Sequence, residues 1–338
     1  MSALGHVELL KQAARRYQES GRYPQACALF VQAAELTEFL DADEASALWN
    51  HAGVCAFRLG DGDRAVTAFR KAIALTTLQH PDRGRWLARL YANLTAACYH
   101  GSRIREAWEA GRQALLLAED IGDPRQAGNA LLNLGLAERY LGMFSDALRH
   151  FARARDRYAE AGALTHVADA LHNLGWVYLD RQAFAEGEEA LVEARAHKRR
   201  LGEPTARIDL ELGRLEALRG NWRGGRSTAL AIMESPEGIT DPITHAQALL
   251  LAAETTQHES LPTALHYADV GVDLALSLGK HPILLDFVPL VIRLHHTAGL
   301  ALSEREQDLA RELYQRRNGV DAFAISGGAH SEERGEGR

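Results

Sequence analysis

Small and apolar residues recur along the chain at fixed offsets. Gly135 is followed twelve, sixteen and nineteen residues later by Ala147, Phe151 and Ala154. The same offsets start again from positions near 14, 53, 95, 175, 213 and 252, although the residue types drift toward the C-terminus. The steps between successive anchors are 39, 42, 40, 40, 38 and 39 residues. A period of this length is the signature of a helical repeat array.

Each period predicts a pair of antiparallel helices. Small residues at the anchor let the two backbones approach, and the aromatic sixteen positions later is expected to fill the space between neighbouring pairs. Within a unit, Leu141-Gly142-Met143-Phe144 supplies a left-handed turn followed by a residue that packs back. Between units, Ile121-Gly122-Asp123-Pro124 ends one helix on glycine and begins the next at proline. The sequence therefore predicts an all-α, right-handed superhelical solenoid of about seven helix pairs.

The C-terminal part departs from the repeat. The segment 283–302 is strongly apolar, and Pro289 is expected to kink or split it. Ser303 then begins a last helix in which Glu306 completes a capping box. We expect segment 283–317 to form a capping helix pair, so that residues 1–318 make a single solenoid. Residues 319–338 are rich in Gly, Ser and Glu and are expected to form a disordered tail.

Charge and composition narrow the partners and the compartment. The 38 basic and 45 acidic side chains give a net charge of −7, with both signs interspersed and no long basic stripe, which argues against nucleic acid. No window is apolar enough to predict a signal peptide or a membrane span. The three cysteines, Cys27, Cys55 and Cys98, each lie in an apolar helical pattern and are expected to be core residues of a reducing compartment. We expect a cytoplasmic protein that binds neither nucleic acid nor membrane.

No arrangement of residues predicts catalysis. The chain has 15 histidines, but none is paired with other ligands at the spacing of a known metal site. The run Gly224-Gly225-Arg226-Ser227 lacks the lysine and the strand-to-helix context of a phosphate loop. We therefore expect a protein that is not an enzyme and has no catalytic residue, metal or cofactor.

The repeats resemble tetratricopeptide (TPR) repeats. The usual TPR pattern has a Leu-Gly pair, an aromatic residue three positions later, and then Ala, Phe and Ala at the offsets given above; the match is strong in the units at Gly53, Gly135 and Gly175. It covers roughly residues 5 to 280, with a period about six residues longer than the usual thirty-four. Long repeats of this kind are similar to those of bacterial peptide-sensing regulators (the Rap, NprR and PlcR group), of the sensor halves of some bacterial transcription activators, and of kinesin light chains. Because the repeats begin near residue 5, we expect no N-terminal effector domain.

A polar stripe follows the first helix of several units, on the face expected to line the inner surface of the solenoid. Asn93, Asn133 and Asn173 stand forty residues apart and form a ladder along it. An asparagine amide offers donors and an acceptor, which match the alternating N–H and C=O groups of an extended peptide. The resemblance implies the same role, because asparagines at this place hold the peptide backbone in the peptide-sensing families. The candidate residues for contact with a peptide or partner are Asn93, Asn129, Asn133, Asn173, Asp169, His172, Trp176, Arg139, Tyr140, Arg89, Tyr99, Arg207 and Arg214.

Other interpretations of these residues stay open. The asparagines are also explained by contacts between neighbouring helices or with water, and Trp176 by a place in the core between units. The other four tryptophans, Trp49, Trp86, Trp108 and Trp222, stand at packing positions of the repeat. From Arg207 onward the ladder stops, so either the groove turns apolar there or the eighth unit folds against it.

The leading hypothesis for function is a binding module that holds an extended peptide or a partner segment in a concave groove, as a signalling-peptide sensor or adaptor. One alternative is a structural scaffold that acts through self-assembly or hetero-assembly, homo-oligomers included. A further alternative, from the resemblance, is the sensor part of a transcription regulator.

Overall fold

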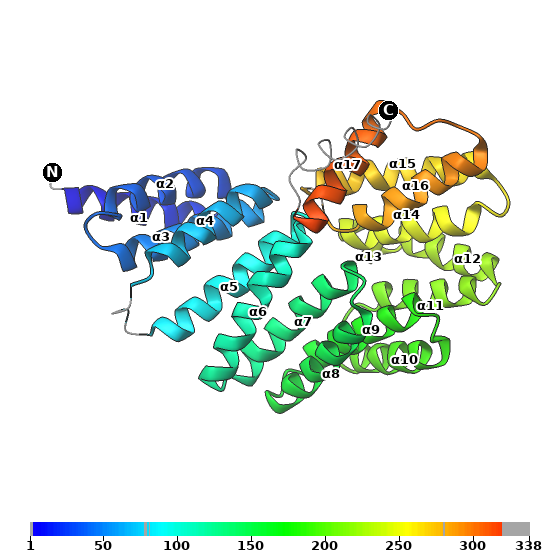
Figure 1. The fold of residues 1–338 in the computed structure, drawn as a ribbon, viewed down its shortest axis with the longest axis horizontal. Helices are drawn as coiled ribbons and strands as arrows, with labels where there is room; N and C mark the ends of the chain where they lie inside the picture. Colours follow the sequence, from blue (N-terminus) through cyan, green and yellow to red (C-terminus); the bar gives the residue numbers. More distant parts are fainter. Residues whose placement is uncertain (1–2, 78–79, 81, 280, 320–338) are drawn as a thin grey trace, which may run out of the picture.

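The computed structural model describes residues 3–77, 80, 82–279 and 281–319. Within these ranges the chain forms seventeen helices and no strand. The helices, coloured along the chain in Figure 1, are α1 (Ala3–Glu19), α2 (Tyr23–Thr37), α3 (Ala42–Arg58), α4 (Gly62–Leu75), α5 (Arg83–His100), α6 (Ile104–Ile121), α7 (Pro124–Tyr140), α8 (Phe144–Glu160), α9 (Leu164–Asp180), α10 (Phe184–Arg200), α11 (Ala206–Leu218), α12 (Trp222–Met233), α13 (Pro236–Thr240), α14 (Pro242–Thr256), α15 (Leu261–Ser277), α16 (Leu284–Ala298) and α17 (Glu304–Asn318).

Consecutive helices pack as hairpins, and each hairpin packs on the next, as in a TPR-like solenoid. The all-α prediction is therefore confirmed. The short helix α13, which joins α12 to α14, has no counterpart in the predicted repeat. The hand of the superhelix and the number of repeat units stay predictions. None of the helices in the described ranges combines the length and apolar character needed to cross a bilayer.

The repeat positions build the contact inside each hairpin. A Cβ atom added to Gly135 would lie 2.7 Å from the ring of Phe151, and one added to Gly53 would lie 2.6 Å from the ring of Phe69. Both rings are buried, with at most 2% of the residue exposed. The sequence predicted that these aromatics lie between neighbouring helix pairs. That prediction is incomplete, because each ring also fills the space that the glycine of its own hairpin leaves open. The three cysteines are buried, as expected.

The last hairpin closes the solenoid onto its earlier part. Of the predicted kink or split at Pro289, the split is wrong, because Pro289 lies inside α16, which continues through it as one helix. The kink stays a prediction. The capping box of Ser303 and Glu306 is confirmed at the start of α17. Gly319 ends this helix in the left-handed conformation, and the rest of the predicted tail, residues 320–338, lies outside the described residues.

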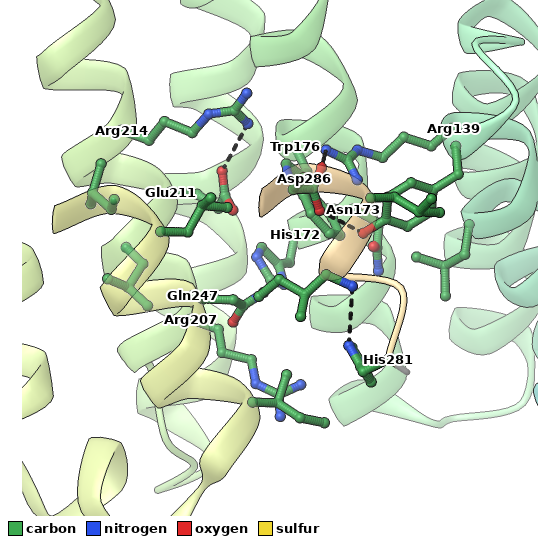
Figure 2. A pocket seen from close by; sticks show the side chains of 18 of the residues that line it. Arg139, His172, Asn173, Trp176, Arg207, Glu211, Arg214, Gln247, His281 and Asp286 are labelled. Carbon is green, nitrogen blue, oxygen red and sulfur yellow. Dashed lines mark hydrogen bonds and ion pairs between the residues drawn. The ribbon is translucent and has the colours of Figure 1, made fainter. Parts of the chain in front are cut away.

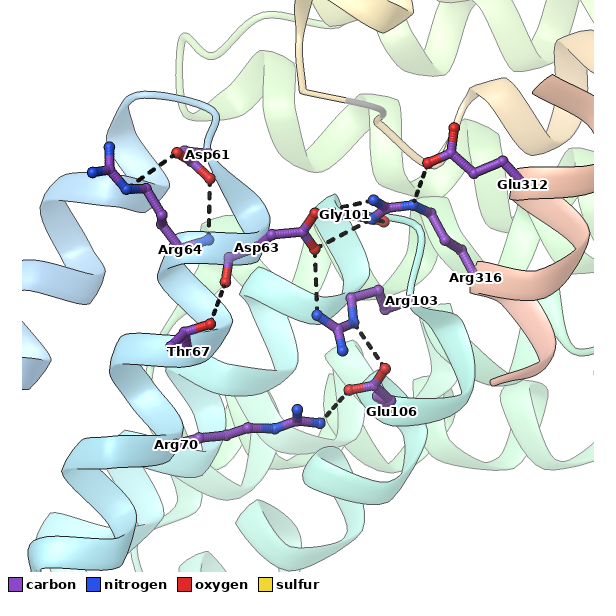
Figure 3. A network of polar contacts seen from close by, with 10 residues as sticks. All are labelled: Asp61, Asp63, Arg64, Thr67, Arg70, Gly101, Arg103, Glu106, Glu312 and Arg316. Atoms are coloured by element: carbon purple, nitrogen blue, oxygen red, sulfur yellow. Dashed lines mark hydrogen bonds and ion pairs between the residues drawn. The ribbon is translucent and has the colours of Figure 1, made fainter. Parts of the chain in front are cut away.

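The contacts of this closure join helices that are distant in sequence. α17 packs against α6, and the Arg316 guanidinium binds both carboxylate oxygens of Asp63 (3.0 and 3.3 Å) and the Gly101 carbonyl (3.1 Å) (Figure 3). The turn after α15 meets the turn after α3, where a Cβ atom on Gly279 would lie 2.0 Å from the Gly60 carbonyl oxygen. The described helices therefore follow a nearly closed path (Figure 1).

Candidate functional site

A cavity of about 500 Å³ lies on the inner side of this path. Its walls come from α5, α7, α9, α11 and α14, and the segment from His281 to Pro289 closes one side. We call it the first cavity (Figure 2). Of the two sequence-based alternatives for the end of the ladder, the second fits this arrangement, because the start of the segment predicted as the capping pair lies against the groove. Leucines such as Leu132, Leu136 and Leu250 line the cavity between polar groups.

Arg139 is the centre of the polar groups around the first cavity. Its side chain is 6% exposed, and its Nε atom donates to Asp180 at 2.7 Å. Its Nη2 atom lies 3.6 Å from Asp286, which also accepts a hydrogen bond from the Tyr140 hydroxyl at 2.8 Å. The guanidinium carbon lies 3.5 Å from the centre of the Trp176 ring, which adds a cation–π contact. The α16 residue Asp286 is thus tied to α7 by both Arg139 and Tyr140.

Carboxylates outnumber their close cationic partners here. Asp180 also binds Arg214 at 2.9 Å, and the two guanidiniums hold its pKa below the ordinary value although burial acts the other way. Glu211 has only a 3.5 Å contact with Arg214, and burial raises the pKa of Glu211 to about 7. Burial likewise raises the pKa of Glu254 and of Asp286. Glu211 is therefore partly protonated near neutral pH.

Three histidines on the cavity wall are neutral at physiological pH. Burial lowers the pKa of His172 to about 3, of His281 to about 3 and of His100 to about 4, and the charge of Arg207 acts in the same direction on each. The His172 ring stacks on Trp176 at 6.4 Å. A neutral imidazole offers one donor and one acceptor, so these rings suit a polar, uncharged ligand group.

Three polar atoms on the wall of the first cavity are buried and have no hydrogen-bond partner among the described residues. They are Arg139 Nη1, His172 Nε2 and Gln247 Oε1. Figure 2 shows their side chains on three different helices around the same space. A buried polar atom without a partner costs about 1–3 kcal/mol. Three such atoms around one space are the feature that most clearly indicates a ligand site.

A second cavity, of about 440 Å³, lies between α5, α6 and α7. Its floor is made of alanines, and its rim carries Arg85, Trp86, Arg89, Gln126 and Asn129 among other polar groups. We call it the second cavity. Within the described part of the chain, no three side chains of the metal-ligating types are placed to hold an ion.

The predicted contact residues divide between the two cavities. Nine line the first cavity: Tyr99, Arg139, Tyr140, Asp169, His172, Asn173, Trp176, Arg207 and Arg214. Three line the second: Arg89, Asn93 and Asn129. Asn133 lines neither and lies half-buried on α7 between them. Their role in binding stays a prediction.

Asn93, Asn129 and Asn173 use part of their hydrogen-bonding capacity within the protein. Asn173 Nδ2 donates to the Asp169 carbonyl at 2.8 Å, and Asn93 Nδ2 donates to Asn50 Oδ1 at 2.9 Å. Asn129 Oδ1 accepts from the Tyr158 hydroxyl at 2.9 Å. Two of these bonds join neighbouring helices, α5 to α3 and α7 to α8, whereas the Asn173 bond stays within α9. In each amide the other end can still meet a ligand.

Several wall residues were not among the predicted contacts. Gln247, Glu254, His281 and Asp286 line the first cavity, and Trp86, assigned to packing, lines the second. On α14, Gln247 and Glu254 each follow a residue of the repeat stripe by one position, so the repeat register could have predicted them. His281 and Asp286 follow the last repeat, where no register applies.

No protein-family model and no curated protein sequence matches the chain. Solved structures do match. A Rap protein complexed with competence and sporulation factor has a TM-score of 0.63 at 13% identity, over 92% of this chain and 99% of that one. The apo form of RapI has a TM-score of 0.57 at 10% identity, over 87% and 99%. Aspartyl phosphate phosphatase F from Bacillus subtilis has 0.55 at 15% identity, over 89% and 74%.

The chain has the fold of the Rap proteins. At these identities the likeness concerns the fold, and the resemblance to this group inferred from the repeats is confirmed at that level.

The raised pKa of Glu211 makes the Rap-like fold of this chain sensitive to pH. Because the folded pKa, about 7, lies above the ordinary 4.5, the stability that Glu211 contributes is complete below pH 4.5 and is lost as the pH rises through 7. Glu211→Gln copies the neutral acid. We expect it to match the wild type at pH 4.5 and to have a free energy of unfolding about 3 kcal/mol higher at pH 8, measured by urea unfolding.

A matched control is Glu189→Gln, which changes an exposed carboxylate on α10. Its unfolding curve should follow the wild type at every pH. A Glu211→Gln curve that does the same would show that the Glu211 carboxylate is not destabilised when it ionises.

Proposed function

We propose that this protein binds a short peptide segment, such as a signalling peptide, in the first cavity. The observation that supports this most is the set of three buried, unpartnered atoms, Arg139 Nη1, His172 Nε2 and Gln247 Oε1. They include a donor and an acceptor, so a purely apolar ligand would leave them without hydrogen bonds and would not remove the free-energy cost of their burial. A peptide backbone offers both N–H and C=O groups along one line and can satisfy them together.

The size and lining of the first cavity favour a few residues of peptide. Its volume of about 500 Å³ falls in the range of about 300–1,000 Å³ that is usual for ligand pockets. Leucine side chains and the Trp176 ring provide apolar contact area beside the polar atoms. Further support comes from one protein with this fold, a Rap protein whose structure holds competence and sporulation factor.

Gln247→Leu separates binding from folding. In the free protein this change removes an unpartnered buried acceptor, so the free energy of unfolding should equal or exceed that of the wild type. In the complex it removes one hydrogen bond to the peptide, so the affinity should fall about tenfold. Peptides retained by the immobilised protein from a randomised pool of synthetic pentapeptides would be identified by mass spectrometry, and their dissociation constants measured by calorimetry.

The control is Gln113→Leu, a change on the exposed face of α6 outside both cavities. It should bind the selected peptides as the wild type does. A pool from which no peptide is retained above background, or an affinity that Gln247→Leu leaves unchanged, would contradict binding in the first cavity.

A further inference from the structure

The second cavity presents an exposed arginine, Arg89, whose charge is not paired with any described carboxylate. Arg89, on α5, makes no hydrogen bond and no ion pair with any described residue. Its guanidinium carbon lies 4.2 Å from the centre of the Trp86 ring, so the two planar groups are stacked. Stacking occupies the face of a guanidinium and leaves its N–H edge available, which is the edge that binds a planar oxyanion.

The Trp86 ring is held in a fixed place. Its Nε1 atom donates to Ser46 Oγ at 2.9 Å, and Ser46 in turn donates to the Ala72 carbonyl at 2.8 Å. The His80 ring lies parallel to the indole, with centres 5.9 Å apart. Arg89 therefore stacks on a platform that the fold builds from α3, α4 and α5.

The groups around the second cavity are suited to an anion. Arg85 and Arg89 bring two positive charges, and Asp82 brings one negative charge at 3.5 Å from Arg85. Asn129 Oδ1 accepts from Tyr158, so the Nδ2 side of its amide remains to donate. The floor of alanines Ala88, Ala92, Ala114, Ala118 and Ala130 provides the space.

Helices α5 and α7 line both cavities. On α7 the second cavity reaches Asn129 and Ala130, and the first begins at Leu132 and extends to Tyr140. From Asn129 to Leu136 the helix rises about 10 Å, the length of about three extended residues. Asn133 and Ala96 lie half-buried between the cavities. A peptide that occupies the first cavity can thus reach the second without leaving these two helices.

We infer that the second cavity binds a carboxylate of the same peptide, from an acidic side chain or the C-terminus, against the N–H edge of Arg89. This inference rests on the proposed function. It assigns the peptide an acidic group about three residues from the part held in the first cavity. Arg85 contributes to the local positive charge, and Asn129 donates a hydrogen bond to the ligand.

The indole N–H resonances of Trp86 and Trp176 report on the two cavities separately in a nitrogen–proton correlation spectrum, with each assigned from its Trp→Phe variant. The probes are two capped tetrapeptides, acetyl-Ala-Ala-Ala-Glu-amide and acetyl-Ala-Ala-Ala-Gln-amide, and inorganic phosphate. We expect the Glu peptide to shift the Trp86 resonance saturably, with the Gln peptide about tenfold weaker, as when a charge-assisted bidentate pair is lost. Phosphate should bind more weakly than the Glu peptide.

Two variants separate recognition by Arg89 from general charge effects. Arg89→Gln should abolish the preference for the Glu peptide. Arg112→Gln removes another arginine stacked on a tryptophan, Trp108, on the exposed side of α6, and should leave the preference intact. Equal affinities for the Glu and Gln peptides, or a preference that survives Arg89→Gln, would overturn the inference.

The remaining outcomes also decide between the proposals. Phosphate as effective as the Glu peptide would make the second cavity a site for free oxyanions and overturn the assignment to a peptide. Shifts of Trp176 without shifts of Trp86 would overturn this inference and leave the proposed function standing. Shifts of Trp86 alone would show an anion site that is not coupled to the first cavity and so contradict a ligand shared by both.

Discussion

Replacing Arg139 with methionine is expected to lower the free energy of unfolding by about 3–5 kcal/mol. The side chain is buried and faces two carboxylates, Asp180 at 2.7 Å and Asp286 at 3.6 Å. Removing the guanidinium leaves these carboxylates in a poorly solvated place with less compensation, which costs more than the ion pairs contribute. Urea unfolding at pH 7, followed by far-ultraviolet circular dichroism, measures the change.

Two further variants test the electrostatic cause. Arg149→Met removes an arginine that pairs with Asp146 at 2.7 Å on the exposed face of α8, and should cost less than about 0.5 kcal/mol. Adding Asp286→Asn to Arg139→Met should recover part of the loss, because one uncompensated charge disappears. If Arg139→Met costs no more than Arg149→Met, the buried ion network does not stabilise this fold.

The second large effect is expected at Gly279. Alanine there would meet the Gly60 carbonyl oxygen at 2.0 Å, and the residue has a φ of +78°, which disfavours any Cβ. Because a backbone atom cannot move aside as a side chain does, the turn after α15 must separate from the turn after α3. We expect a loss of about 3–4 kcal/mol and a larger radius of gyration by small-angle X-ray scattering.

Gly202→Ala is the matched control for backbone strain. Gly202 has a φ of +67° and no atom within 4 Å of its added Cβ. Its variant should therefore lose only the strain of about 1–2 kcal/mol and keep the wild-type radius of gyration. Equal losses and equal radii for the two variants would show that the Gly60–Gly279 contact does not hold the ends of the path together.

The sequence was sufficient to predict the hairpins because their determinants are local. Glycines in the turns, prolines at the helix starts and the small residue opposite Phe69 or Phe151 each act within one period. Ser303 and Glu306 are three residues apart, so their capping box could be read directly. The wrong prediction of a split at Pro289 also has a physical reason. Pro289 removes the N–H that would donate to the Leu285 carbonyl, but neighbouring bonds such as Phe287 N–H to the Ile283 carbonyl remain, and the buried Phe287, Leu290 and Leu294 anchor the helix.

The candidate site was predictable only in part. A spacing of forty residues places side chains on one face of the solenoid, and nine of thirteen candidates do line the first cavity. The boundary of that cavity depends on a contact that no spacing reveals, because Tyr140 and Asp286 are 146 residues apart. The curvature accumulated over many hairpins brings them together. The same curvature leaves Asn133, the middle member of the ladder, between two cavities.

The contact of α17 with α6 and with Asp63 has a consequence for the order of folding. In an open repeat array each hairpin touches only its neighbours, and unfolding can start at either end. Here Arg316 binds Asp63 across 253 residues, so most hairpins belong to one loop that opens as a unit. Closing a loop of this length is slow relative to forming the local hairpins, so it is expected as a late step. Among the described helices, α1, α2 and α3 come before Asp63 in the chain, so the hairpin of α1 and α2 lies outside this loop and is expected to open independently of it.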